Sequence, residues 1–359
     1  MKILHVGLYN SKYGMGGAEQ MIFELACTMK DDYGDEAACA VNPGDLTEKL
    51  KEKGIQVTPI YWSKARTLQT LLQLKRVLSA FRPDLIHSHH RFTTFLLDSF
   101  FKKKYKILHT QYVPTYNRRR IFRYGHFAAT THESVRQNLI EVYRVPANRI
   151  LAIRSGIRPL KPEQEKVARL RKKFPEASDK FRLLFIGRLE EQKGHIYLIE
   201  AVQKLASSYR QRLRIFLAGD GSLREDLKNR VRKAGLEDVF IFLGYSIEIP
   251  ELLSWCDALI LPSLWEATPL CILEAYSVGR PVIATDIPGT EGLVKPEETG
   301  FLVRPRDGEG LARVLAQAMD HPEKIETMGK KAFQWWSREF ARDVMIVRYR
   351  KLYEDLIGL

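Results

Sequence analysis

Short apolar runs alternate with longer amphipathic stretches along the first half of the chain. The short runs predict buried strands, whereas stretches with apolar residues at every third or fourth position predict helices. The predicted strands are residues 2–8, 37–41, 55–60, 84–89, 106–110, 126–131 and 149–154, and the predicted helices are 18–29, 67–81 and 132–143. This alternation predicts a parallel sheet covered by helices on both faces.

The alternation stops at residues 155–181 and then starts again. That segment is polar and contains three prolines, so it predicts a connection between domains with one helix inside it. Further strands are predicted at 181–187, 213–219, 239–244, 258–262 and 281–285, and helices at 195–209, 222–235, 270–278 and almost throughout 307–357. We therefore expect an α/β protein with two doubly wound Rossmann-like domains that face each other across a cleft. Ligands of such sheets bind beyond the carboxyl ends of the strands.

The composition agrees with two globular domains. The chain has 359 residues, of which 45% are hydrophobic and 28% are charged, and cores of about 150 residues need no disulfide or metal. No apolar run reaches the roughly 20 residues of a membrane span, and the N-terminal segment lacks the apolar region of a signal peptide. The cysteines have no ligand spacing and predict free thiols in a reducing cytoplasm: Cys27, Cys39, Cys256 and Cys271.

The positive charge of the chain is confined to its first half. The net charge is +14, yet residues 1–180 hold 32 basic and 17 acidic side chains, against 25 and 26 in residues 181–359. The excess is densest in residues 51–123, where aromatic residues stand beside the cations of 100–106 and 118–124. The asymmetry favours a surface that meets a bilayer, a lipid-phosphate acceptor or nucleic acid over a solvated basic face without a partner.

A glycine-rich turn follows the first predicted strand. Gly14, Gly16 and Gly17 permit close approach of the backbone to a ligand, and the helix that begins at 17–20 can turn N–H groups toward an anion. The spacing matches neither the dinucleotide fingerprint nor the phosphate-binding P-loop. On these residues alone, a phosphate site and a plain turn at the start of a helix are equally compatible.

Histidines end the strand at 84–89. In extended chain, His87 and His89 share one face and His90 points the other way. No carboxylate or cysteine follows at ligand spacing, and the chain contains no Asp-X-Asp pair, so no metal site is expected. Without further context, a cluster of surface histidines is favoured over one histidine that donates to a polar substrate.

Charged residues also follow predicted strands of the second domain. Arg188 ends one strand and Lys193 opens the next helix, an arrangement that suits a diphosphate. Thr268 is predicted to cap the helix at 270–278, with Pro269 in its first position and Gly279 just beyond its end. Glu266 precedes this helix and Glu274 lies within it, where two carboxylates could hold sugar hydroxyls beside a phosphate. Exposed cations and paired acids are also common without a ligand.

Together these motifs resemble those of retaining glycosyltransferases of family 4, which have the GT-B fold. The resemblance covers nearly the whole chain. It is strongest in Gly187-Arg188 with Lys193-Gly194, and in the E-x7-E pair Glu266 and Glu274 followed by GRPVIATDIPG at 279–289. Supporting motifs are GGAE at 16–19, PDLIHSH at 83–89, ESVRQNLIE at 133–141 and TGFLV at 299–303.

The resemblance implies a role for each matching position. The implied catalytic residues are His89, Glu266, Arg188 and Lys193, and the implied donor-binding residues are Gly16, Gly17, Arg188, Lys193, Gly244, Tyr245, Thr268, Pro269, Leu270 and Glu274. His89 and Glu266 would meet the sugar, although His90 is adjacent, and Glu274 would bind the ribose. Ala267 stands where glycine is common, and RSGI at 154–157 replaces an Asn-Gly dipeptide, but neither change removes a charged group.

The implied protein transfers a sugar with retention from a nucleotide donor, UDP being the first choice, without metal or cofactor. Residues 1–157, with a returning helix at 341–359, would form the acceptor side, and 158–340 the donor side. The acceptor would be a glycan or lipid-linked molecule of polysaccharide or lipopolysaccharide biosynthesis. The basic first domain would dock from the cytoplasm on the inner face of the membrane.

Two alternatives stay open: a sugar-nucleotide epimerase of the same fold, and a nucleic-acid-binding protein. The E-x7-E pair and the motif at 83–89 favour a transferase over an epimerase. Nucleic-acid binding through residues 51–123 would leave the motifs of the second domain unexplained.

Overall fold

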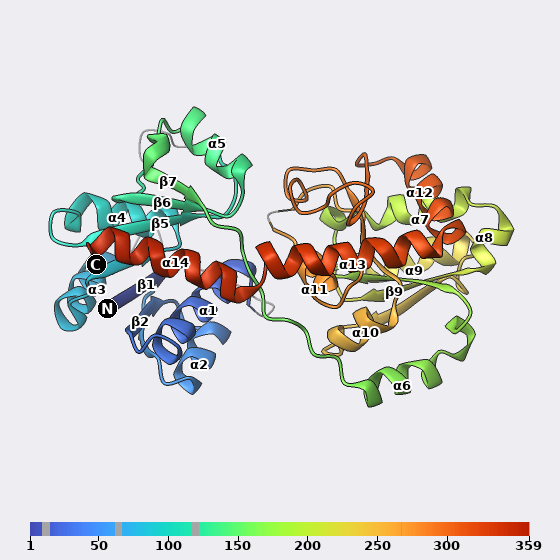
Figure 1. The fold of residues 1–359 in the computed structure, drawn as a ribbon, viewed down its shortest axis with the longest axis horizontal. Helices are drawn as coiled ribbons and strands as arrows, with labels where there is room; N and C mark the ends of the chain where they lie inside the picture. Colours follow the sequence, from blue (N-terminus) through green and yellow to red (C-terminus); the bar gives the residue numbers. More distant parts are fainter. Residues whose placement is uncertain (9–14, 62–66, 117–121, 267, 359) are drawn as a thin grey trace. The chain divides into compact units, whose positions relative to one another are not determined.

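The computed structural model of the chain describes residues 1–8, 15–61, 67–116, 122–266 and 268–358 (Figure 1). Gly14, Ala267 and residues 118–121 of the basic run therefore lie outside the described residues. The chain divides into two compact units, Met1–Gly156 with Arg342–Leu359, and Ile157–Ala341. The second unit extends one residue beyond each end of the predicted second domain.

The first unit is built on a parallel sheet of seven strands in the order β3-β2-β1-β4-β5-β6-β7. Its strands are β1 (Lys2–Gly7), β2 (Glu36–Val41), β3 (Gln56–Pro59), β4 (Leu85–Ser88), β5 (Lys106–Gln111), β6 (Phe127–Thr130) and β7 (Ile150–Ala152). Its helices are α1 (Gly17–Asp31), α2 (Asp45–Glu52), α3 (Thr67–Phe81), α4 (Arg91–Phe101), α5 (Glu133–Glu141) and α14 (Arg342–Ile357). The strand order reverses direction between β1 and β4, which confirms the predicted doubly wound topology.

Adjacent residues of β1 point into two different cores of this unit. Ile3 packs with Leu25 of α1 and Tyr349 of α14, whereas Leu4 packs on the other face with Leu74 of α3 and with α4. Side chains of a strand alternate between its faces, so each face needs its own helical cover. Helices lie on both sides of the sheet as a result.

The second unit repeats this plan with a parallel sheet of six strands in the order β10-β9-β8-β11-β12-β13. Its strands are β8 (Phe181–Ile186), β9 (Leu213–Ala218), β10 (Phe240–Gly244), β11 (Ala258–Leu261), β12 (Val282–Thr285) and β13 (Gly300–Val303). Its helices are α6 (Gln164–Lys173), α7 (His195–Lys204), α8 (Ser207–Gln211), α9 (Arg224–Lys233), α10 (Ile249–Trp255), α11 (Leu270–Ser277), α12 (Gly308–Asp320) and α13 (Pro322–Glu339). The α6 helix lies within the predicted connection.

Several short elements were not predicted, and two predicted helices are divided. The helices α2 and α10 have only eight and seven residues, so they show little periodicity. The α4 sequence is rich in Phe and Thr, which have low helix propensity. The predicted helix at 195–209 breaks where Leu205 and Ala206 are extended. The predicted helical tail breaks before Pro322, since proline cannot continue a helix but can start one.

No helix among the described residues has both the length and the apolar sequence needed to cross a bilayer. The α13 helix has 18 residues, but charged Lys, Glu and Arg side chains occur along its whole length, so its sequence is not apolar. Its apolar residues instead form a stripe that packs on the second unit's core.

Candidate functional site

The carboxyl ends of β8, β9 and β10 are held together by glycines. Gly187 and Gly219 follow β8 and β9 with φ angles of 148° and 157°. A Cβ atom on Gly219 would lie 1.8 Å from the carbonyl oxygen of Gly187, and the Gly219 N–H donates to the Gly244 carbonyl at 2.8 Å. Only glycine fits this contact, so three strand ends present bare backbone at one edge.

The structure brings Lys193 to this edge. Lys193 ends a short turn, and a Cβ on Gly187 would lie 3.3 Å from its Cε and 3.6 Å from its Nζ. The turn is pressed against the strand end of β11, because a Cβ on Gly194 would lie 2.0 Å from the Pro262 carbonyl oxygen. Arg188, next to Gly187, is exposed and makes no hydrogen bond or ion pair with the described residues.

Lys193 also joins the first motif of this unit to the second. Its Nζ donates to Oε1 of Glu266 at 2.6 Å, and the same oxygen accepts from Ser263 Oγ at 2.7 Å. The two side chains are 14% and 7% exposed. Gly289 closes the other side of Glu266, since a Cβ there would lie 2.4 Å from the Glu266 carbonyl oxygen. Lys193 and Ser263 thus fix the Glu266 carboxylate, and Gly289 packs against its backbone.

The α11 helix begins at Leu270, the first residue of its predicted range, but its N-cap lies one residue later than predicted. Pro269, not Thr268, is its N-cap, because Pro269 keeps an extended ψ of 94° and its carbonyl accepts from the Ile272 N–H. The predicted C-terminal end is confirmed. Gly279 has φ +71°, and the Arg280 N–H donates back to the Ala275 carbonyl at 2.9 Å.

Glu274 lies on α11 with a carboxylate that is largely removed from water. Burial raises its pKa above the ordinary value. This carboxylate makes no hydrogen bond or ion pair with the described part of the chain. A desolvated acceptor of this kind can hold the hydroxyl groups of a ligand. At the end of β10, Tyr245 is 84% exposed and offers an aromatic ring to solvent.

In the first unit, Gly16 is the N-cap of α1 and Gly17 its first residue. Oε2 of Glu19 accepts from the Gly16 N–H at 2.8 Å, so a carboxylate folds back on the helix start that was predicted to face an anion. Burial raises the pKa of Glu19, which is 9% exposed. The sequence motif contains this glutamate, but its position over the N–H groups was not predicted.

The predicted surface cluster of histidines is wrong, because His87 and His89 are 0% and 2% exposed. His87 lies on β4 and His89 directly follows it, and β4 pairs with β1, where His5 lies opposite His87. The His87 ring is held between Tyr353 Oη and Thr110 Oγ1, each at 2.7 Å. Burial lowers the pKa of His87 well below its usual value, so the ring is neutral at pH 7.

His89 extends a chain of hydrogen bonds along the same face. Its Nε2 lies 3.1 Å from Nδ1 of His5, and its Nδ1 lies 2.7 Å from the Tyr112 hydroxyl. Burial also lowers the pKa of His89 well below its usual value. His90 is more exposed, and its Nδ1 accepts from the Phe92 N–H to cap α4.

Ring nitrogens of His5, His87 and His89 lie within 4.8 Å of one another, the spacing of a possible metal site. These rings are already hydrogen-bonded to one another and to Tyr and Thr hydroxyls. A metal ion bound by His87 and His89 would have to replace those bonds.

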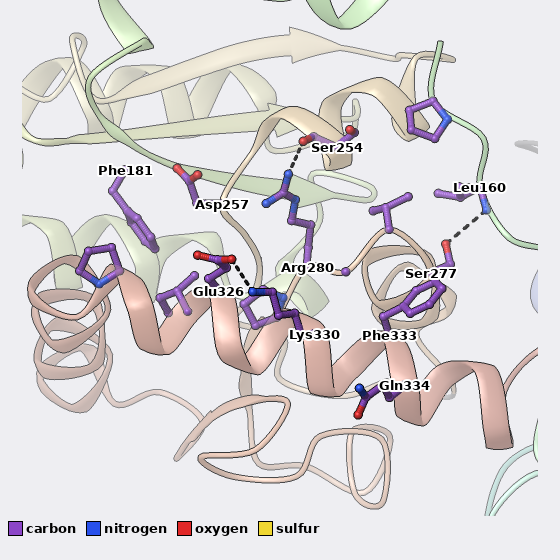
Figure 2. A pocket seen from close by; sticks show the side chains of 16 residues that line it. Leu160, Phe181, Ser254, Asp257, Ser277, Arg280, Glu326, Lys330, Phe333 and Gln334 are labelled. Atoms are coloured by element: carbon purple, nitrogen blue, oxygen red, sulfur yellow. Dashed lines mark hydrogen bonds and ion pairs between the residues drawn. The ribbon is translucent and has the colours of Figure 1, made fainter. Parts of the chain in front are cut away.

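A cavity of about 990 Å³ lies at the opposite edge of the second sheet (Figure 2). Phe181, Asp257 and Pro281, which line it, stand at or just before the first residues of β8, β11 and β12. Arg280 reaches into its centre from the end of α11, and α13 forms one wall. None of the predicted site residues lines this cavity.

Comparisons with known proteins agree with the family that the sequence resembles. A family model described as "Glycosyl transferases group 1" matches residues 166–335, and one described as "Glycosyltransferase Family 4" matches residues 15–159. A UDP-Gal:alpha-D-GlcNAc-diphosphoundecaprenol alpha-1,3-galactosyltransferase of Escherichia coli is 33% identical over 179 residues, 49% of this chain and 46% of that protein. The chain likewise spans about half or less of the length of other curated relatives that it matches.

Two further relatives match along their whole length. The lipopolysaccharide core biosynthesis glycosyltransferase LpsD of Rhizobium meliloti is 23% identical over 371 residues, covering 99% of this chain and 98% of that protein. The crystal structure of Anabaena HepE in complex with UDP has a TM-score of 0.87 at 20% identity, covering 99% of this chain and 100% of that one. This likeness confirms the expected GT-B fold.

Proposed function

Because this chain belongs to the family 4 glycosyltransferases and has the GT-B fold, we propose that it moves a sugar from a nucleotide donor to an acceptor of the cell envelope. The names of its relatives support a UDP-sugar as donor and a glycan or lipid-linked acceptor, since one uses UDP-Gal and a diphosphoundecaprenol and another builds lipopolysaccharide core. HepE was crystallised with UDP.

The observation that carries this proposal is the position of Lys193. Its ammonium lies beside Gly187, the neighbour of Arg188, and contacts Glu266 at 2.6 Å. The two motifs that the sequence places 73 positions apart therefore meet at one edge of the sheet. Carboxyl edges of parallel sheets are where such folds bind their ligands.

Positive charge at this edge suits the departure of a nucleoside diphosphate. When the bond from the anomeric carbon to the diphosphate oxygen breaks, negative charge grows on the leaving group. Arg188 and Lys193 would stabilise that charge, aided by the N–H groups of Thr268, Leu270 and Gly17. The sequence has no Asp-X-Asp pair for a divalent ion, so we propose a reaction that needs no metal or cofactor.

The remaining site residues would orient the sugar nucleotide. We assign Glu274 to the ribose hydroxyls, Gly244 and Tyr245 to the base, and Glu266 and His89 to the sugar. The acceptor oxygen bonds to the anomeric carbon on the face that the diphosphate leaves, and its proton passes to the departing phosphate oxygen. The configuration of the sugar is then retained.

The first unit has a face suited to an anionic membrane. On α3, Leu68 and Leu72 are 71% and 50% exposed, and Lys75 and Arg76 follow one turn later on the same side. Phe100 at the end of α4 is 61% exposed and precedes the exposed Lys103 and Lys104. Both helices pack on the same core. We propose that this face binds the cytoplasmic leaflet, where the lipid-linked acceptor is available.

A donor screen tests the proposed function. The purified protein is mixed with UDP-, GDP- and TDP-sugars, and binding is measured by calorimetry. The best donor is then incubated with and without membrane lipid extract as a source of acceptors. A transferase forms a glycosylated lipid only when the extract is present. Interconversion of the free donor without an acceptor would instead identify an epimerase, and binding of no nucleotide would reject both.

A further inference from the structure

We infer that the cavity at the amino-terminal edge of the second sheet binds a small organic anion, a carboxylate or phosphate ester with an apolar body, and that Arg280 binds the charge of this ligand. Such a site goes beyond the proposed transfer of a sugar, whose residues in this unit lie at the carboxyl edge of the same sheet. The inference rests on the size, the lining and the charge balance of the cavity (Figure 2).

The cavity has the size of a ligand site and is separate from the candidate donor site. Its volume of about 990 Å³ is at the upper end of the range for small-molecule pockets, and all of its lining residues belong to the second unit. Phe181 lines the cavity at the first residue of β8, whereas Gly187 lies beyond the other end of that strand. The two edges are about 20 Å apart, at a rise of about 3.3 Å for each residue of the strand.

The walls of the cavity are largely apolar. They include Leu160 from the connection before α6, Val278 from the end of α11, and Ile325 and Phe333 from α13. Phe333 is 45% exposed, so an apolar body in the cavity would remove part of this ring from water, which is favourable. Apolar walls with a few converging polar groups are typical of sites for small molecules.

The charges that line the cavity are paired except for that of Arg280. Arg182 holds the Asp257 carboxylate with its Nε at 3.1 Å and its Nη2 at 2.8 Å, and Lys330 pairs with Glu326 at 2.6 Å. Arg280 makes no ion pair with the described residues. Burial lowers the pKa of its guanidinium below the ordinary value. A cation that has lost water without gaining a counter-ion favours an anionic ligand.

The guanidinium of Arg280 is held in place and keeps donors for a ligand. Its Nε–H donates to the Leu253 carbonyl at 3.2 Å, and its Nη2 donates to the Ser254 carbonyl. Both carbonyls belong to the last turn of α10, so these bonds orient the side chain. An arginine has five N–H donors, and the other three find no acceptor among the described residues. Paired N–H groups of this kind match the oxygens of a carboxylate or phosphate.

Fluorescence titration with anilinonaphthalene sulfonate, an aromatic anion that brightens in apolar surroundings, tests the site. We expect Arg280→Gln to raise the dissociation constant of this probe by about tenfold or more, the effect of a lost hydrogen bond to a charged group. Arg280→Lys keeps the charge and should raise it less, although it disturbs the bonds to α10 as well. Wild-type affinity in Arg280→Gln, or no binding to the wild type, would overturn the inference.

A variant of the cavity wall keeps the test decisive if Arg280→Gln does not fold. Phe333→Asp leaves Arg280 and its bonds to α10 in place, and it should weaken probe binding severalfold because it replaces an apolar wall by a carboxylate. Thr327→Asp adds the same charge at an exposed position of α13 that does not line the cavity, so it is the matched control and should bind as the wild type does. Equal affinities of the two variants would contradict binding in this cavity.

Competition experiments define the ligand class and separate this site from the donor site. Naphthoate and naphthyl phosphate should displace the probe, and the stronger competitor identifies carboxylate or phosphate as the preferred anion. Naphthol, which lacks the charge, should displace it poorly, and equal displacement by naphthol would reject the role of Arg280. UDP should leave the probe bound, and full displacement by UDP would mean that the probe occupies a nucleotide site. These results are obtained even if the protein transfers no sugar, in which case the proposed function fails separately.

Discussion

Lys193 illustrates how one residue can serve two motifs. The sequence assigns it to the donor diphosphate, and the structure adds its ion pair with Glu266 at 2.6 Å. Both side chains are mostly buried, so each depends on the other for a counter-charge. The ammonium is therefore held beside Gly187 before any ligand arrives.

We expect Lys193→Gln to lower the free energy of unfolding by about 1–3 kcal/mol, because it leaves the Glu266 carboxylate buried without its cation. Urea denaturation measures the loss. The double variant Lys193→Gln, Glu266→Gln should recover part of it, since the amides carry no charge, yet remain inactive. A single variant as stable as the wild type would show that the pair is not formed in solution.

Arg188 is expected to matter for turnover and not for stability. It is exposed and makes no hydrogen bond or ion pair with the described residues. Arg188→Ala should lose about 10²- to 10³-fold in turnover, the effect of one lost group that stabilises transition-state charge. Arg232→Ala, whose side chain on α9 is 70% exposed, is the matched control and should be unchanged. Normal turnover in a folded Arg188→Ala protein would reject the diphosphate assignment.

Buried neutral histidines make stability depend on pH. Burial lowers the pKa of His5 to about 3 and those of His109 and His195 to about 4. Below pH 6.5 the unfolded chain binds protons that the folded chain does not, so the free energy of unfolding falls as the pH drops toward 4. Each histidine contributes at most about 1.4 kcal/mol per pH unit.

Urea denaturation at pH 7.5, 6.5 and 5.5 measures this dependence. His109→Gln should reduce the slope between pH 6.5 and 5.5. Equal slopes in the wild type and His109→Gln would mean that His109 titrates alike in the folded and unfolded chain.

At the scale of elements, the turn between β8 and α7 determines the position of Lys193 in the candidate donor site. Gly194 has φ +65° and would place a Cβ 2.0 Å from the Pro262 carbonyl oxygen, next to β11. Gly235 after α9 has nearly the same φ, +64°, but nothing lies within 4 Å of its Cβ position. A side chain at either glycine would strain the backbone, but only a side chain at Gly194 would also overlap a neighbouring residue. Comparing substitutions at the two positions therefore distinguishes the two effects.

We expect Gly235→Ala to cost about 1 kcal/mol of stability, which is the strain of a left-handed backbone. Gly194→Ala should cost more, since its methyl group overlaps backbone that cannot rotate away, and it should also lower turnover by moving Lys193. Thermal unfolding and transfer assays on both variants measure the two effects. Equal stability of the two variants would contradict the close contact with Pro262.

At the scale of the whole molecule, the uneven distribution of charge follows the division into two units. The basic excess lies in residues 1–180, most of which belong to the first unit, and residues 181–359 hold 25 basic and 26 acidic residues. Exposed apolar residues accompany the cations on α3 and at the end of α4. This combination suits an interface of lipid headgroups better than a purely ionic partner.

Vesicle flotation at low salt tests that surface. Replacing both Lys103 and Lys104 by Gln should weaken binding to anionic vesicles by about 30-fold, at about 1 kcal/mol for each lysine. The same change at Lys330 and Lys331, two exposed lysines of the second unit, should have little effect. Equal binding of the wild type to neutral and anionic vesicles would count against membrane docking.

Most of the regular structure could be predicted because hydrophobic periodicity is a local property. The helix at 67–81 was predicted to the residue, and the turn at Gly279 was predicted together with the end of its helix. Short elements such as α10 and β13 were missed, since four to seven residues contain too few repeats to show a period. The N-cap of α11 was predicted one residue too early because Thr268 is also a favourable cap in isolation.

The sequence by itself determined the two alternating halves, the charge asymmetry and the identity of the motif residues. Each of these features can be recognised from residues that are close together in the sequence. Only the tertiary structure decided which of these residues touch. His5 and His89 are 84 positions apart, and Lys193 and Glu266 are 73 apart. Such pairs form only when strands take their order in a sheet. That order is set by the joint burial of many side chains, and no local pattern contains it.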